Sequence, residues 1–353
     1  MISCDSSSVL PRRYLIPLDE ADWEELYAIA KKQCLVGVLF DGIKKLPAEQ
    51  VGMKMGLLFQ WIAKNRMLEK ANVRLNDAAI QVSEWFRKKG FRTCILKGQG
   101  NALMYPNPYS RTPGDIDIWV EGGDKRVISF VRSISPHEKA CYHHIEFPLY
   151  KGVEVEVHYR PSFLLCFWHN RKLQKYYERV KEEQFLHRVM LGKQGEIAIP
   201  TMEFNLIFQL THIYAHLMNE GIGLRQLVDY YYVLISDDLL LIRDRVQKEL
   251  KELGLWMFAG AIMYIMQEVF GMPASRLIVP PNEKCGKFVL NEVLEAGNFG
   301  KHDERNRFGR SKLGHNLQRV YRDIRLVRYF PAEALCEPLF RLWHFFWRVK
   351  NKK

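Results

Sequence analysis

The chain lacks several patterns that would assign it to a common class. Its seven cysteines are scattered and never form a Cys-x-x-Cys pair, which argues against a zinc site and fits reduced thiols in a cytosolic protein. The first residues lack the basic start and apolar stretch of a secretory signal, so we do not expect export. The most apolar long run, residues 253–267, is shorter than the ~20 residues that cross a bilayer. It therefore predicts a buried helix and no transmembrane segment.

Positive charge is concentrated near the C-terminal end. The formal net charge is +12, and residues 301–328 hold nine basic residues against three acidic ones, a net +6. Such a segment favours a polyanion such as RNA or an anionic membrane surface, whereas a solvated helix face is the common alternative. The aromatic and basic residues 341–350 leave a similar choice between peripheral membrane or nucleic-acid contact and docking into a helical domain.

The hydrophobic periodicity divides the chain into three parts. Apolar residues recur at three- and four-residue spacing over residues 20–89 and again beyond residue 200. Between them, short β-favouring runs occupy residues 91–96 and 116–120, and a predicted helix covers residues 125–133. The runs 145–150 and 153–158, separated by Lys151-Gly152, predict a hairpin of antiparallel strands. We therefore predict an α+β fold, with a small mixed β-sheet core over 91–200 between an N-terminal helical region (1–90) and a C-terminal helical domain (201–353).

Carboxylates cluster on the predicted strands. Strand alternation places Asp115 and Asp117 on one face, and Glu154 and Glu156 share a face of the later strand with His158. Adjacent acids repel one another, and a divalent cation relieves that repulsion. Three acids that hold Mg²⁺ or Mn²⁺ against phosphate oxygens are the ligand type that these hard cations prefer. The third ligand is Glu156 or Glu154, and Glu156 is also a candidate to accept a proton.

A glycine turn offers a place for phosphates. Lys97-Gly98-Gln99-Gly100 lies between a predicted strand and a short helix, where glycine lets the backbone approach an anion. Arg111 precedes the acids and is a candidate to neutralise phosphate charge. The alternatives are that Lys97 only flanks the turn and that Arg111 only pairs with Asp115 or Asp117.

Taken together, these elements resemble the nucleotidyltransferase superfamily of polymerase-β type, and more closely a bacterial family of uncharacterised nucleotidyltransferases. The resemblance covers about residues 90–235. It is carried by the following segments: Leu96-Lys97-Gly98, Tyr105-Pro106, Arg111, Asp115-Ile116-Asp117-Ile118, Val155-Glu156-Val157-His158-Tyr159-Arg160, Leu210-Thr211-His212 and Leu224-Arg225-Gln226. One departure is Gln99, where many members of the superfamily have serine or glycine.

The resemblance implies both an activity and a set of residues. It implies metal-dependent transfer of a nucleoside monophosphate from a nucleoside triphosphate to an acceptor, with Asp115, Asp117 and Glu156 as catalytic metal ligands. The residues that it implies around the nucleotide are Lys97, Gly98, Arg111, Arg225 and Asp229. Arg225 and Asp229, one helical turn apart, have pairing with each other as an alternative role. The acceptor is not specified, and an anionic one such as RNA fits the basic segment.

Two other readings come from different classes of protein. A nucleotide- or RNA-binding module without turnover would keep the scaffold and account for the missing serine hydroxyl. A peripheral membrane protein would use the aromatic and basic tail. His212 and His216 have the spacing of zinc ligands, but without the pattern His-Glu-x-x-His we expect them to pack or to line a cleft.

Overall fold

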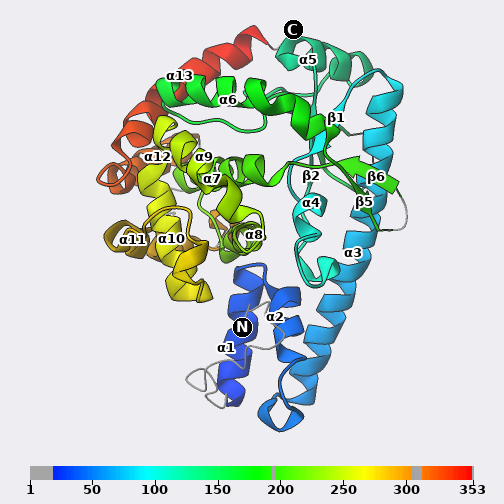
Figure 1. Cartoon of the computed structure of the whole chain (residues 1–353), viewed down its shortest axis with the longest axis vertical. Coiled ribbons are helices and arrows are strands. Elements are labelled where there is room, and N and C mark those ends of the chain that lie inside the picture. The colour runs from blue at the N-terminus through cyan, green and yellow to red at the C-terminus, as the bar shows by residue number, and fades with distance from the viewer. Residues whose placement is uncertain are drawn as a thin grey trace.

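The computed structural model describes residues 19–148, 150, 152–192, 195–301, 303, 305 and 312–351. Its N-terminal part contains α1 (Glu20–Lys32), α2 (Val36–Ile43) and the long α3 (Met55–Lys88). Asp19 begins α1 with a capping box, because its side chain accepts from the Asp22 backbone N–H at 2.9 Å. Figure 1 shows α1 and α2 beside the first half of α3, while the second half of α3 runs along the sheet.

The central sheet has four strands in the order β1-β2-β4-β3. These are β1 (Thr93–Ile95), β2 (Ile116–Val120), β3 (His144–Glu146) and β4 (Val155–His158), with the helices α4 (Gln99–Ala102) and α5 (Gly123–Ile134) in the connections. The predicted antiparallel pairing of β3 with β4 is confirmed, although residues 149 and 151 of the expected turn lie outside the described residues. β2 pairs in parallel with β4, which makes the sheet mixed.

Helices build the remainder of the chain. After the central sheet come the long α6 (Phe167–Leu186) and a two-stranded sheet of β5 (Arg188–Leu191) and β6 (Gly195–Ala198), and the C-terminal helices follow. They are α7 (Met202–Asn219), α8 (Leu224–Leu234), α9 (Leu239–Glu252), α10 (Trp256–Phe270), α11 (Glu283–Ala296), α12 (Lys312–Leu326) and α13 (Pro331–Lys350). Short 3₁₀ helices cover Ala48–Gln50, Pro108–Ser110, Ala274–Arg276 and Asn298–Gly300.

The predicted α+β class is confirmed, with helices on both sides of a small mixed sheet (Figure 1). The apolar run at residues 253–267 contributes most of the buried α10, which ends at Gly271 in the left-handed conformation (φ +64°). No helix in the described part of the chain is both long and apolar enough to cross a membrane. α6 and the β5–β6 pair were not predicted.

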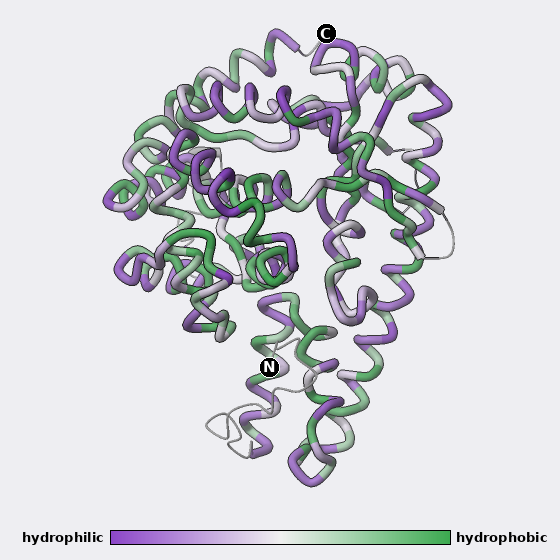
Figure 2. The backbone as a smooth tube through the Cα atoms, viewed as in Figure 1, coloured by the Kyte–Doolittle hydropathy of each residue, from purple (hydrophilic) through white to green (hydrophobic). Residues whose placement is uncertain are grey.

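The two faces of the sheet pack against different partners. Ile116 and Ile118 of β2 face the α3 side, where they join a cluster with Phe86. Trp119 points the other way and packs on Phe185 of α6, with ring centroids 4.8 Å apart. Figure 2 shows hydrophobic residues along the strands and along α10. The division at residues 90 and 200 stays a prediction.

Candidate functional site

Three acidic side chains meet where β2 and β4 run in parallel. Asp115 lies immediately before β2, Asp117 lies within it, and Glu156 is the register partner of Asp117 on β4. One carboxylate oxygen from each acid lies within 4.8 Å of the others. Glu154 is exposed and lines a different depression on the surface. The geometry therefore groups Glu156, and not Glu154, with the two aspartates.

Two cationic groups hold the buried Asp117, whose exposed fraction is 2%. Its Oδ1 lies 2.9 Å from the Lys97 Nζ and 2.9 Å from the His158 Nε2. Burial alone would raise the pKa of Asp117, but Lys97 and His158 outweigh it and hold that pKa well below its usual value. Repulsion from Asp117, together with burial, raises the pKa of Asp115. The acids therefore repel one another, and nearby positive charge lowers the energy of this repulsion.

The histidines beside the acids differ in charge. Burial disfavours the charged form of His158, but hydrogen bonds to Asp117 and Glu156 raise its pKa to about 9, so it carries a proton at neutral pH. Burial lowers the pKa of His144 to about 4, so that ring is neutral; its Nδ1 lies 3.4 Å from Glu156. A protonated His158 donates hydrogen bonds to the acids and cannot act as a base. His144 was missed, because only the pairing of β3 with β4 reveals its position.

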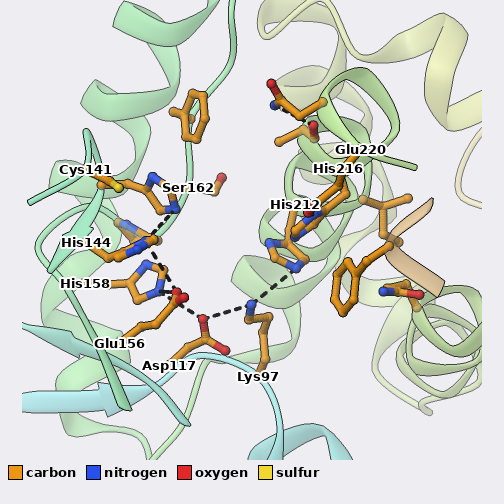
Figure 3. A pocket seen from close by; sticks show the side chains of 18 of the residues that line it. Lys97, Asp117, Cys141, His144, Glu156, His158, Ser162, His212, His216 and Glu220 are labelled. Carbon is orange, nitrogen blue, oxygen red and sulfur yellow. Dashed lines mark hydrogen bonds and ion pairs between the residues drawn. The ribbon is translucent and has the colours of Figure 1, made fainter. Parts of the chain in front are cut away.

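Lys97 and Gly98 form the turn between β1 and α4. Lys97 also approaches the His212 Nε2 at 3.3 Å, so the chain His158–Asp117–Lys97–His212 crosses the site (Figure 3). Gly98 has φ +55°, which a residue with a side chain rarely adopts. α4 is only four residues long, so its dipole is small. Gln99 does not replace a serine hydroxyl, because its Nε2 donates to Asn76 of α3 at 3.1 Å.

Arg111 forms an ion pair with Asp229, and not with Asp115 or Asp117. Its Nε and Nη2 each donate to the Asp229 carboxylate at 2.8 Å, in a bidentate pair where both residues are buried. The Tyr105 hydroxyl donates to the same carboxylate at 2.6 Å. The alternative of a bridge to Asp115 or Asp117 is therefore wrong. Arg111 nevertheless lines the cavity above the acids.

Arg225 has an incompletely paired guanidinium in the same cavity. The alternative that it pairs with Asp229 is not realised as a hydrogen bond or ion pair among the described residues; its Nη1 donates to the Thr112 carbonyl at 3.2 Å. Among the described residues, its buried Nε has no hydrogen-bond partner. Burial, followed by repulsion from Arg111, lowers the pKa of Arg225. An anion beside this guanidinium would supply a hydrogen-bond acceptor for the Nε and a negative charge to offset the burial of the cation.

His212 and His216 line the cavity, as expected. Burial, together with the neighbouring Lys97, lowers the pKa of His212 well below its usual value. The His216 Nδ1 lies 2.5 Å from the Glu220 carboxylate. Among the described residues, the pair belongs to no cluster with metal-ligand spacing. Figure 3 shows both rings on the wall opposite His144 and His158.

A cavity of about 530 Å³ lies over the acids, within the range of about 300–1,000 Å³ typical of small-molecule sites. The C-terminal helices α12 and α13 supply one wall of it. Their lining residues are Arg319, Glu337, Phe340, Arg341, His344 and Arg348. Sequence reasoning did not connect these residues with the acids, because no local pattern tells which helix covers the sheet edge.

Much of the basic segment faces the interior of the protein. Arg305 and Arg325 both pair with Glu292 of α11, at 2.8 and 3.1 Å. Arg322 donates to the backbone carbonyls of Asn219 and Glu220 at the end of α7. The segment is therefore only partly a solvated face; residues 306–311 lie outside the described residues. The tail docks partly as well, since Trp343 packs edge-on against Tyr142 with ring centroids 5.4 Å apart.

Comparison with known proteins bears on the family of the chain and not on individual site residues. No curated protein matches the chain in sequence. A solved structure, an antigenic nucleotidyltransferase-like protein from Paracoccidioides brasiliensis, is similar at 14% identity, covering 51% of this chain and 92% of that one with a TM-score of 0.29. At that TM-score the likeness does not establish a shared fold. The model of a family described as "Uncharacterised nucleotidyltransferase" matches residues 19–271. Because this match covers well over half of the chain, the chain belongs to the family of uncharacterised nucleotidyltransferases.

Proposed function

We propose that the chain is a metal-dependent nucleotidyltransferase of the polymerase-β type that uses a nucleoside triphosphate. The observation that carries this proposal is the register pairing of Asp117 with Glu156, beside Asp115, at the floor of a cavity. Family membership supports a transferase but does not identify its substrates.

The donor set fits a hard divalent cation. Asp115, Asp117 and Glu156 offer carboxylate oxygens within 4.8 Å of one another, and Mg²⁺ and Mn²⁺ prefer oxygen ligands. The protein now balances these acids with the Lys97 ammonium and the proton on His158. Bound cations would neutralise the triphosphate and polarise the phosphorus that is attacked.

Basic groups around the acids suit the triphosphate. Lys97 and Gly98 lie at the turn, and Arg225 brings an unpaired guanidinium nitrogen into the same cavity. Asp229 holds Arg111 in place, so we propose that Arg111 contributes a fixed positive field and that Asp229 acts through it. Arg225 is the best candidate for direct phosphate contact, because in the described part of the chain its buried Nε has no hydrogen-bond partner.

The transfer itself requires one bond to form and one to break. The acceptor oxygen forms a bond to the α-phosphorus, and the bond from that phosphorus to the pyrophosphate oxygen breaks, releasing pyrophosphate. The acceptor hydroxyl must lose its proton, and we propose that the Glu156 carboxylate, which His158 keeps ionised by lowering its pKa despite burial, accepts it.

The acceptor is proposed to be anionic. Arg319, Arg341 and Arg348 line the wall formed by α12 and α13. Glu337 lies 3.7 Å from Arg319 and 3.4 Å from Arg341. RNA is one acceptor of this charge class, and the wall would attract it through its phosphates.

Binding without turnover is the competing function, favoured by the buried Gln99 in place of a serine hydroxyl. The two are separated by measuring pyrophosphate release and nucleotide binding in one set of samples. Each nucleoside triphosphate is incubated with Mg²⁺, cell extract, and either the natural chain or a variant with Asp115→Asn and Asp117→Asn. Excess pyrophosphate from the natural chain supports transfer. Tight binding by calorimetry with no excess pyrophosphate would overturn the enzyme proposal in favour of the binding module.

A further inference from the structure

A second cluster of metal-ligating side chains lies where the start of α6 meets the first turns of α13. It contains Cys166, His169 and Glu333, and Cys336 lies beside Cys166; none of these four residues lines the cavity over the acids. We propose that these four side chains bind one zinc ion and thereby fasten α13 to α6. This inference is independent of the proposed function.

Each helix contributes a pair of ligands at a spacing of one turn. Cys166 and His169 are three residues apart at the start of α6, and Glu333 and Cys336 are three apart on α13, so each pair shares a helix face. Ligand atoms of Cys166, His169 and Glu333 lie within 4.8 Å of one another, with His169 Nδ1 3.3 Å from Glu333 Oε1. Cys336 lies outside this group of three, but its thiol is hydrogen-bonded to the Cys166 thiol, and we assign it as the fourth donor. Two sulfurs, one imidazole and one carboxylate suit tetrahedral zinc.

The surroundings already hold the ligands in place. Glu333 Oε2 accepts from the backbone N–H groups of Leu165 and Cys166 at 2.5 and 3.1 Å, which leaves Oε1 directed at His169. The His169 ring lies against Gly254, where an added Cβ would come within 2.4 Å of it. Outer contacts of this kind orient ligands in natural zinc sites.

The charge of the cluster points to a cation. Glu333 is 2% exposed, and among the described residues no lysine or arginine pairs with it; its ion-pair partner there is His169. A buried carboxylate without a counter-charge is costly. Zn²⁺ would supply that charge, and the two thiols would release their protons to solvent on binding, with no change of oxidation state.

Sequence patterns do not reveal this site, because each pair of ligands combines two different residue types. A search for Cys-x-x-Cys finds nothing, whereas the fold brings a Cys-x-x-His pair against a Glu-x-x-Cys pair from the other end of the chain. α13 also carries Arg341 and Arg348 of the cavity wall. Zinc would therefore help to fix the wall that we propose for the acceptor.

The test measures the zinc content of a variant that lacks the three carboxylates of Asp115, Asp117 and Glu156. The variant with Asp115→Asn, Asp117→Asn and Glu156→Gln is purified with zinc, dialysed against metal-free buffer and analysed by mass spectrometry of the elements. We expect one zinc per chain, falling to nearly none when Cys336→Ser or His169→Asn is added. Cys285→Ala, at a buried thiol on α11, is the matched control and should retain the zinc.

Cobalt substitution tests the same site without further changes. We expect the visible bands of tetrahedral Co²⁺ and a thiolate-to-cobalt charge-transfer band from the chain with intact Cys166 and Cys336. Absence of both zinc and these bands would overturn the proposal. So would retention of zinc by the Cys336→Ser and His169→Asn variants, or a disulfide between Cys166 and Cys336 found by alkylation without reductant. Pyrophosphate release by the natural chain is a separate measurement, so failure here leaves the proposed function untouched.

Discussion

Asp117 and Glu156 are register partners on the parallel strands β2 and β4. Directly paired residues on neighbouring strands project their side chains to the same face of a sheet. This pairing brings together two acids from distant parts of the chain, while Asp115 joins them from the residue before β2. The acid cluster therefore depends on the parallel pairing of β2 with β4, which the β3–β4 hairpin alone does not provide.

Glu156 and Glu154 should differ sharply in importance. Glu156→Gln removes a carboxylate from the acid cluster, so we expect nucleotidyl transfer to fall by about 100-fold or more. Glu154→Gln changes an exposed residue outside the cavity and should leave the rate unchanged. The measurement is the initial rate of Mg²⁺-dependent pyrophosphate release. Equal losses in the two variants would contradict this assignment of the third ligand.

The buried pair of Arg111 and Asp229 should be needed for stability. Asp229→Asn leaves the Arg111 guanidinium buried without its charge partner, which we expect to lower the free energy of unfolding by about 3–5 kcal/mol. The exposed pair of Arg188 and Glu196 is the control, and Glu196→Gln should cost about 0–1 kcal/mol. Urea unfolding followed by circular dichroism compares the two. Similar losses of unfolding free energy in the two variants would contradict a larger contribution of the buried pair to stability.

The acids between α12 and α13 should make stability depend on pH. Asp323 and Glu337 are both buried, and burial, followed by repulsion from Glu337, raises the pKa of Asp323 to about 7. Between its ordinary value of 3.8 and about 7, the folded protein holds a proton that the unfolded chain has lost. The stability contribution of Asp323 therefore falls as pH rises through this window.

Replacing this acid should remove that contribution. We expect Asp323→Asn to raise the melting temperature relative to the natural chain at about pH 8, and by much less at about pH 5. Asp244→Asn, at an exposed acid of α9, controls for the general loss of a negative charge. A shift of Asp323→Asn that is equal at both pH values would refute the raised pKa.

Arg348 should contribute to acceptor binding. It lies on α13, lines the cavity wall and is proposed to meet an anionic acceptor. Arg348→Ala should raise the amount of acceptor needed for half-maximal transfer by roughly tenfold, as expected for the loss of one charge-assisted hydrogen bond. Lys350→Ala removes the same charge from the same helix outside the cavity and should have little effect. Transfer rates measured against increasing extract concentration would test this, and a changed requirement for the nucleoside triphosphate instead would contradict it.

Local patterns predicted the local structure well. Residues 116–120 form β2 as expected, and the β3–β4 pairing follows the predicted hairpin. α6 was missed because it is largely polar, with only a few buried apolar residues such as Leu173 and Phe185. Its periodicity was therefore weak.

Contacts between distant residues were beyond local reasoning. The pairing of Arg111 with Asp229 joins the segment before β2 to α8, and spacing along the chain gives no sign of it. The cavity wall from α13 and the position of His144 likewise depend on how the helices and strands pack. The acids were found because strand alternation is local, whereas their surroundings required the fold.

Transfer of an α-phosphate label tests the central claim most directly. The chain is incubated with Mg²⁺, cell extract and nucleoside triphosphates labelled at either the α- or the γ-phosphate. We predict that the α-label enters a macromolecular or small acceptor, that the γ-label leaves as pyrophosphate, and that Asp115→Asn with Asp117→Asn abolishes transfer. Incorporation of the γ-label, or α-label transfer that persists in that variant, would contradict nucleotidyl transfer at Asp115, Asp117 and Glu156.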